Sequence, residues 1–202
     1  AALLLVQAFW PPLAVGLNPP GWSISCEAFF YAVWPRLVGL LRTERTGLPW
    51  RRGLLLWLVG LAAPVLGILA LRAGLLPPGP FATITDNASG SELLARALAY
   101  LPPLRLPEFA LGIALGHALR RTPARPASVA TDTIRESGLA CALLASTAAL
   151  GSGLVSRLSG VALADRIAIE CGALVPLFAL LVWQLARGRG LLQQLLSRGA
   201  LR

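Results

Sequence analysis

The 202-residue sequence has no methionine, no lysine and a single histidine, His117. Only 13% of its residues are charged, about half the share found in a soluble globular domain. All 18 basic residues are arginines, and they lie between apolar runs instead of gathering on one polar face. The scarcity of charge excludes an ordinary soluble domain, and the placement of the arginines argues against nucleic acid as a partner.

Residues that commonly carry chemistry are scarce as well. The three cysteines, Cys26, Cys141 and Cys171, are far apart in the sequence. Their odd number and wide spacing predict neither a disulfide framework nor a metal site, so we interpret them as small apolar core residues. His117 lies next to the arginines at 120–121, at the end of an apolar run. There we expect a structural role at a helix end for this histidine.

The sequence is rich in long apolar runs. Hydrophobic residues make up 56% of it, and the mean hydropathy is +0.69. A helix needs about 20 mostly apolar residues to cross a bilayer. The segments that qualify are 23–41, 53–75, 102–119, 137–156 and 166–186, and residues 1–10 resemble the end of a further helix. We therefore predict an all-α polytopic integral membrane helix bundle, with five full transmembrane helices plus the end of a sixth.

The arginines predict how these helices are oriented. They cluster in alternate connections, at 42–52, 120–135 and 187–202. Because basic residues accumulate in cytoplasmic loops, we expect these stretches on the cytoplasmic side, and the arginine-poor connections 76–96 and 157–165 outside. We expect 76–96 to be a long loop. Small residues at three- and four-residue steps predict that 137–156 is an interior helix.

Three carboxylates, those of Glu27, Glu108 and Glu170, fall inside predicted helices. Each costs on the order of 3 kcal/mol in a bilayer, and so needs a partner, a proton or a water-filled cavity. Arg105 precedes Glu108 by three residues and Arg166 precedes Glu170 by four, spacings that place each pair on one helix face. The carboxylates either line one cavity open to the outside, or form structural ion pairs and snorkel to the interface.

The most distinctive polar segment is residues 18–31, Asn-Pro-Pro-Gly-Trp-Ser-Ile-Ser-Cys-Glu-Ala-Phe-Phe-Tyr. Its turn leads to Trp22, an aromatic residue of the kind that lies at membrane interfaces. Ser23 is predicted to cap the helix by accepting a free backbone N–H. Glu27 is four residues further on, on the same face as Ser23, and we expect the aromatic residues that follow to enclose it.

Residues 22–31 resemble the Trp-Ser-Leu-Ser-x-Glu-x-x-Phe-Tyr signature of the membrane-bound acyltransferase 3 family, whose members are multi-helix bacterial inner-membrane proteins that O-acylate sugars. Residues 105–112, Arg-Leu-Pro-Glu-Phe-Ala-Leu-Gly, are similar to that family's Arg-x-x-Glu-Phe-x-x-Gly segment. The family's first helix, with its essential histidine, and its last segment have no counterpart in the sequence. The resemblance implies that residues 1–202 are part of a single acyltransferase-type transmembrane domain, lacking its N-terminal helices and last helix and inactive alone.

The resemblance also implies roles for particular residues. Acyl transfer needs a base for the acceptor hydroxyl and donors for the developing oxyanion. The base is expected in the N-terminal part that precedes this sequence, and no metal is expected. The candidate catalytic residues are Glu27 and Arg105, and the candidate substrate-binding residues are Trp22, Ser23, Ser25, Tyr31 and Glu108.

The function expected from the resemblance is membrane-bound O-acyl transfer. An acyl group such as acetyl would pass from a cytoplasmic donor, acyl-CoA or acetyl-CoA, to a hydroxyl of an extracytoplasmic glycan or glycolipid such as a polysaccharide or lipopolysaccharide. The expected location is the bacterial plasma membrane, with the lipid bilayer as partner and no bound cofactor. The alternatives are an ion-coupled transporter or flippase of a glycan or lipid precursor, whose intramembrane carboxylates bind the coupling ion, and a scaffold without chemistry.

Overall fold

A computed structural model describes residues 6–14, 20–41, 49–75, 80–82, 87–122 and 127–197. Within these ranges the chain is almost entirely helical, which confirms the all-α prediction. The α-helices are α1 (Gly21–Leu41), α2 (Pro49–Gly60), α3 (Ala62–Arg72), α4 (Gly90–Tyr100), α5 (Pro102–Arg121), α6 (Val129–Gly151), α7 (Leu154–Ser159), α8 (Ala164–Glu170), α9 (Val175–Arg187) and α10 (Leu191–Ser197). Two 3-10 helices, η2 (Gln7–Phe9) and η3 (Pro11–Leu13), and an antiparallel pair of short strands, β1 (Pro80–Ala82) and β2 (Asn87–Ser89), complete the fold.

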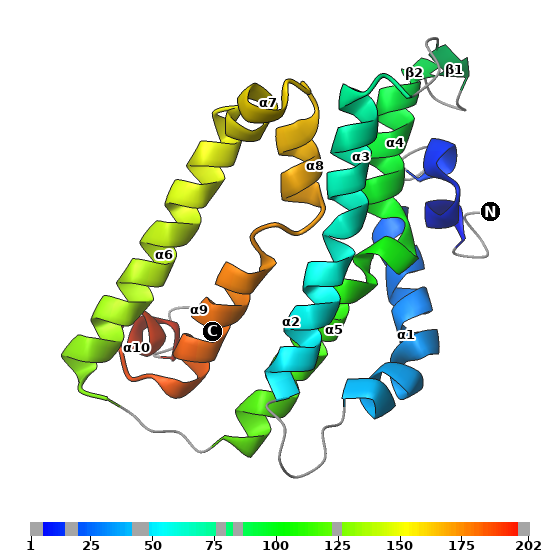
Figure 1. Ribbon diagram of the computed structural model, residues 1–202. Coiled ribbons are helices and arrows are strands. Elements are labelled where there is room, and N and C mark those ends of the chain that lie inside the picture. The colour runs from blue at the N-terminus through cyan, green and yellow to red at the C-terminus, as the bar shows by residue number, and fades with distance from the viewer. Residues whose placement is uncertain are drawn as a thin grey trace.

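The helices run between two ends of the molecule (Figure 1). α1, α5 and α9 end, and α2 and α6 begin, at the lower end of the view, whereas α3 ends and α4 and α8 begin at the upper end beside α7. Three pairs of helices, α2 with α3, α4 with α5 and α8 with α9, each follow one another along a single path between the ends. The paths are interrupted at Leu61, at Leu101 and at residues 171–174.

Three helical segments, not the predicted five, are long and apolar enough to cross a membrane in the part of the chain that the structure describes. They are Gly21–Leu41, Trp50–Arg72 and Ala164–Arg187. The other two predicted spans do form long helices, α5 and α6. α5 carries Arg105, Glu108 and the arginines at 120–121, and α6 is rich in Ala, Gly, Ser and Thr. These residues lower the mean hydropathy of both helices, so apolar composition alone does not identify them as spans.

Two other predictions about the elements are wrong. Residues 90–96 of the expected loop 76–96 lie in α4, where Ser89 Oγ accepts the backbone N–H of Glu92 at 3.2 Å and caps the helix. Residues 7–9 form the 3-10 helix η2 in place of the end of a membrane helix. Pro11 explains the second error, because the residue before a proline disfavours the α conformation and Trp10 is extended. Residues 1–5 lie outside the described ranges.

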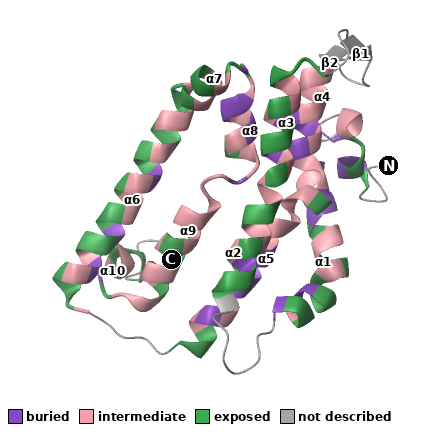
Figure 2. Ribbon diagram, in the orientation of Figure 1, coloured by how far each residue is buried: buried purple, intermediate pink, exposed green. Residues whose placement is uncertain are grey.

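α6 lies at the edge of the described structure and is not an interior helix (Figure 2). Only Asp132, Glu136 and Leu143 of this helix are buried. Gly138 and Ala145, from the predicted stripe of small residues, are exposed, and a Cβ at Gly138 would meet no described atom within 4 Å. α6 packs against α9 and α10, and its two buried carboxylates accept backbone N–H groups at the start of α10.

Close packing of α2 on α5 fixes the position of α5 in the bundle. A Cβ at Gly53 would lie 2.5 Å from Ala114 Cβ, and a Cβ at Gly60 would lie 2.5 Å from Pro107 Cγ. Glycine at both positions therefore lets the two backbones approach closely, as small residues do between membrane helices. On its other side α5 packs against α1, with Leu37, Leu41, Ala110, Ile113 and Ala114 forming a buried cluster.

Candidate functional site

A proline in the first turn of the following helix accompanies each of the three helix interruptions. These prolines are Pro64 in α3, Pro102 in α5 and Pro176 in α9. A proline has no N–H and clashes with the carbonyl four residues earlier, so each helix starts anew at this point. Gly172 completes the break between α8 and α9 with a φ of +76°, a left-handed conformation that favours glycine.

Side chains from α2 and α5 satisfy the backbone at the break between α8 and α9. Trp57 Nε1 donates to the Gly172 carbonyl at 3.1 Å, and Arg105 Nη1 donates to the Glu170 carbonyl. Arg105 Nη2 also lies 2.9 Å from Glu108 Oε2, which confirms the predicted pair on one face of α5. Both side chains are about one-fifth exposed. The guanidinium is thus held by a carboxylate of its own helix and a carbonyl of another.

A cleft of about 320 Å³ lies between α1 and α5 beside this ion pair. Its lining residues are Trp22, Ser23, Cys26, Glu27, Phe30, Arg105, Glu108 and Phe109. The structure therefore brings together five of the seven residues that the sequence indicated. The other two are elsewhere: Ser25 is buried and donates to the Gly21 carbonyl at 3.2 Å, whereas Tyr31 is 71% exposed and does not line the cleft.

Aromatic contacts hold the start of α1 against the junction of α4 and α5. The rings of Trp22 and Tyr100 lie 5.0 Å apart, and Phe30 stacks on Phe109 with ring centroids 4.5 Å apart. Cys26 Sγ donates to the Tyr100 carbonyl at 3.7 Å. These contacts set the walls of the cleft, because each joins a lining residue of α1 to the helix path that carries Arg105.

Two expectations about the polar residues near the cleft require correction, and one open alternative is decided. α1 begins at Gly21, so Ser23 lies inside the first turn and its hydroxyl donates to the Pro20 carbonyl at 2.8 Å instead of capping the helix. Glu27 is exposed, so the aromatic side chains that share the cleft with it do not enclose it. Of the two alternatives for Glu170, the structure shows the structural ion pair: its carboxylate accepts from Arg166 Nε at 2.9 Å, and it does not line the cleft with Glu27 and Glu108.

Several residues that shape this region were not identified from the sequence. Glu92 of α4 accepts from Arg166 Nη1 at 2.9 Å, which extends the predicted pair of Arg166 and Glu170 into a network joining α4 to α8. Trp57 and Gly172 were not singled out either. A tryptophan N–H in an apolar run and a glycine shortly before a proline are the signals that indicate them. Among the described residues, no three His, Cys, Asp or Glu side chains lie where they can hold a metal ion.

A comparison with known proteins shows an acyltransferase as a relative. Over 123 residues the chain is 36% identical to the acyltransferase MdmB of Streptomyces mycarofaciens, a match that covers 58% of this chain and 28% of that protein. The chain thus spans less than a third of the relative's length. No family model matches the chain, and no solved structure matches it significantly. The similarity is therefore to part of a protein named as an acyltransferase.

Proposed function

We propose that this chain forms part of a membrane-bound O-acyltransferase of the acyltransferase 3 type. The enzyme moves an acyl group such as acetyl from an acyl-CoA donor to a hydroxyl of an extracytoplasmic glycan or glycolipid. The observation that carries the proposal is the cleft between α1 and α5, where Glu27, Arg105 and Glu108 come together from both resembling segments. The acyltransferase named as a relative supports the same class of reaction.

Arg105 is the candidate for stabilising the oxyanion. In the reaction the acceptor oxygen bonds to the thioester carbonyl carbon, the hydroxyl proton passes to a base, and the C–S bond breaks to release the thiol. Negative charge develops on the carbonyl oxygen before the thiol leaves. Arg105 has five N–H donors, of which the Glu170 carbonyl and Glu108 engage part, and its side chain lines the cleft. Its remaining donors supply the oxyanion contact.

Glu27 and the aromatic walls are candidates for holding the acceptor. The exposed Glu27 carboxylate accepts hydrogen bonds from sugar hydroxyls and orients the one that reacts. Trp22 and Phe30 line the same cleft and offer apolar ring surface to the C–H groups of a sugar. Glu108 acts indirectly, because its ion pair with Arg105 fixes the guanidinium beside the cleft.

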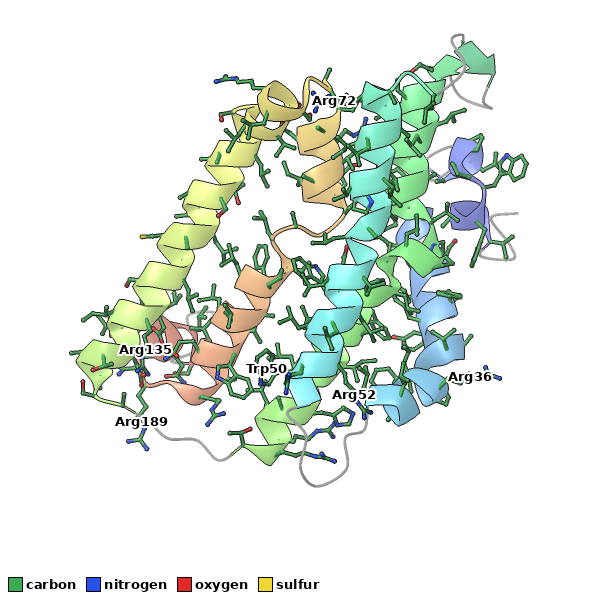
Figure 3. The ribbon with its side chains drawn as sticks, viewed as in Figure 1. Arg36, Trp50, Arg52, Arg72, Arg135 and Arg189 are labelled. Carbon is green, nitrogen blue, oxygen red and sulfur yellow. The ribbon has the colours of Figure 1, made fainter. Side chains whose placement is uncertain are left out.

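The arrangement of arginines supports a multi-pass protein of the bacterial plasma membrane. Figure 3 shows Arg36, Arg52, Arg135 and Arg189 towards one end of the helices and Arg72 at the other. The arginine-rich end is placed in the cytoplasm by the positive-inside rule. In that orientation the acyl-CoA donor approaches from the arginine-rich end and the glycan acceptor from the opposite side.

The helix breaks also bear on the alternative of an ion-coupled transporter. Transporters use the free carbonyls of interrupted helices to bind ions. At the break between α8 and α9, however, the Glu170 and Gly172 carbonyls accept from Arg105 and Trp57. Since protein donors already fill these positions, and one of them is a cation, the break does not provide a cation site. Acyl transfer therefore accounts for the geometry better than ion-coupled transport.

The test is acyl transfer by the complete protein carrying Glu27→Gln or Arg105→Lys. Glu27→Gln keeps the size of the side chain and removes its charge, and Arg105→Lys keeps the charge and loses the planar set of donors. We expect Arg105→Lys to lower the O-acyl content of surface glycans at least about a hundredfold, as loss of an oxyanion donor does. Glu27→Gln should also lower it, because the sugar hydroxyl loses a charged hydrogen-bond acceptor. Arg36→Lys, at an exposed arginine of α1 outside the cleft, is the matched control.

Mass spectrometry of surface glycans from strains with and without the gene provides the readout, with the amount of each variant in the membrane measured alongside. An O-acyl mass increment that needs the gene supports the enzyme. A changed amount of glycan without any mass shift would support transport instead. Full acylation by both cleft variants would exclude Glu27 and Arg105 from the mechanism.

A further inference from the structure

The cleft beside Glu27 continues into a second, larger one along the same two helices. The second cleft has a volume of about 800 Å³, and it shares Glu108 and Phe109 with the first. Its other lining residues are Trp34, Val38, Gly112, Ile113, Gly116, His117, Arg120 and Arg121. Together the two clefts form one groove between α1 and α5, which we call the α1–α5 groove. It leads from Trp22 to the end of α5 at Arg121.

Two glycines keep the floor of this groove open. Glu108, Gly112, Gly116 and Arg120 follow one another at four-residue steps and so lie on one face of α5. A Cβ at Gly112 or Gly116 would meet no described atom within 4 Å. Each glycine inside a helix costs about 1 kcal/mol relative to alanine. No described neighbour requires the small residue at either position, in contrast to the glycines of α2 that pack on α5.

Charge and polarity change along the groove in a definite order. At the end of α5, Arg120 and Arg121 are exposed and line its mouth. The middle is lined by apolar side chains that include Trp34 and Ile113. At the far end lies the ion pair between Arg105 and Glu108, next to the first cleft. A ligand that matches this order has an anionic end, a long uncharged middle and a reactive group opposite Arg105.

The length of the groove agrees with such a ligand. Arg120 follows Glu108 by 12 residues, which corresponds to about 18 Å along the helix axis. In a coenzyme A thioester, about 12 bonds separate the sulfur from the oxygen that carries the diphosphate, equivalent to about four residues of extended backbone or 14 Å. The diphosphate adds further reach. A donor with its phosphates at the mouth can therefore place its thioester at Arg105.

We propose that the α1–α5 groove binds the acyl-CoA donor, with its phosphates at Arg120 and Arg121, its pantetheine arm over Gly112 and Gly116, and its thioester at Arg105. This inference rests on the proposed acyltransferase function and assigns the donor path within it. Gly112 and Gly116 determine donor binding because any larger side chain there occupies the space of the arm. The acceptor binds in the first cleft and does not contact these glycines.

The first test narrows the groove with Gly112→Leu and Gly116→Leu in the complete protein in membrane vesicles. We expect each to reduce kcat/KM for acetyl-CoA at least about tenfold, with the KM for the acceptor unchanged. Gly112→Ala and Gly116→Ala add only a Cβ where no described atom lies within 4 Å, so each should lower kcat/KM for acetyl-CoA less than the leucine variant at the same position. The matched control is Gly39→Leu, since Gly39 is an exposed glycine of α1 with the same open space and no place in the groove.

The second test removes charge at the mouth. Arg120→Gln should raise the KM for acetyl-CoA about tenfold, but leave transfer from acetyl-N-acetylcysteamine, a thioester without phosphates, unchanged. Arg36→Gln is the control, because Arg36 is exposed on α1 and projects outward at the edge of the molecule (Figure 3). An equal loss with both thioesters would assign Arg120 a structural role and overturn the donor site at the mouth.

A direct binding measurement covers the case in which a leucine variant does not reach the membrane. In a background with Cys26, Cys141 and Cys171 replaced by serine, a maleimide should label Gly116→Cys, and excess acetyl-CoA should slow that labelling, whereas Gly39→Cys should label equally with and without it. If the parent protein transfers the acyl group and the leucine variants are unimpaired, the groove is not the donor site. The same conclusion follows if acetyl-CoA does not slow the labelling of residue 116. Either result would leave the proposed function standing. Absence of transfer from any thioester by the parent would instead overturn the proposed function itself.

Discussion

Replacing Gly172 with alanine tests whether the break between α8 and α9 and the ion pair on α5 form one unit. Gly172 has a φ of +76°, and a Cβ built on it would lie 2.6 Å from Glu108 Cδ and 2.9 Å from Glu108 Cγ. These distances are too short for carbon atoms, so the Glu108 side chain has to move. Because Glu108 Oε2 lies 2.9 Å from Arg105 Nη2, this movement breaks the ion pair.

The expected loss of stability follows from two contributions. A non-glycine residue in the left-handed region costs roughly 1–2 kcal/mol. Losing an ion pair whose side chains are about one-fifth exposed adds on the order of 1 kcal/mol, the upper end for pairs that solvent screens. Gly172→Ala should therefore destabilise the protein by about 2–3 kcal/mol. For a chain of this size that corresponds to a fall in Tm of roughly 4–12 °C.

The assay is thermal unfolding in detergent, followed by loss of the monodisperse peak in size-exclusion chromatography. Gly74→Ala is the matched control, because Gly74 has a φ of +66° and a Cβ there meets nothing within 4 Å, so only the backbone contribution applies. In a Glu108→Ala background the Glu108 side chain is already absent, so Gly172→Ala should lower the stability no more than Gly74→Ala does. Equal losses for Gly172→Ala and Gly74→Ala in the parent would refute the contact between residue 172 and Glu108.

Two further predictions concern partly buried hydrogen bonds. Trp57→Phe removes the donor to the Gly172 carbonyl at 3.1 Å and should lower the free energy of unfolding by about 1–3 kcal/mol, measured in the same thermal assay. Trp50→Phe is the control, because that side chain is 42% exposed and its replacement should change the stability little. Equal effects of the two substitutions would contradict the role of the Trp57 indole N–H. Glu136→Ala removes a carboxylate, 1% exposed, that accepts two backbone N–H groups of α10, and should speed proteolysis at residues 188–190. Cleavage at the parent rate would show that this carboxylate does not hold α10.

The features predicted correctly from the sequence are those set by neighbouring residues. Helix spacing alone places Arg105 beside Glu108 and Arg166 beside Glu170, and both pairs are present. Alternate arginine-rich connections predicted an alternating order of helices, and the described helices do alternate between the two ends. The meeting of Glu27 with Arg105 and Glu108 in one cleft was expected as well, but from the family resemblance and the shared depth of the carboxylates and not from any local rule.

The features that were missed depend on contacts between distant segments or on proline. A hydropathy average over about 20 residues does not register a single proline such as Pro64 or Pro176. The predicted spans therefore run unbroken through both helix interruptions. The hydrogen bond from Trp57 to the Gly172 carbonyl joins residues 115 apart in sequence, and no local pattern indicates it. Likewise, Glu92 in an expected loop meets Arg166 on α8, 74 residues away. Such pairings follow from how the helices pack, which residue spacing does not determine.

Arg105 links the break in the α8–α9 path to the chemistry proposed for the cleft. A guanidinium whose side chain is only about one-fifth exposed is costly to desolvate unless it is compensated, and here Glu108 supplies charge while the Glu170 carbonyl supplies a hydrogen-bond acceptor. That carbonyl has no partner within α8 only because the helix stops at Glu170. The break therefore provides the acceptor that fixes Arg105 from a second side, and Gly172 leaves the space that Glu108 occupies. A donor fixed in this way before substrate binds needs no reorganisation as the oxyanion forms, which is the condition for electrostatic catalysis.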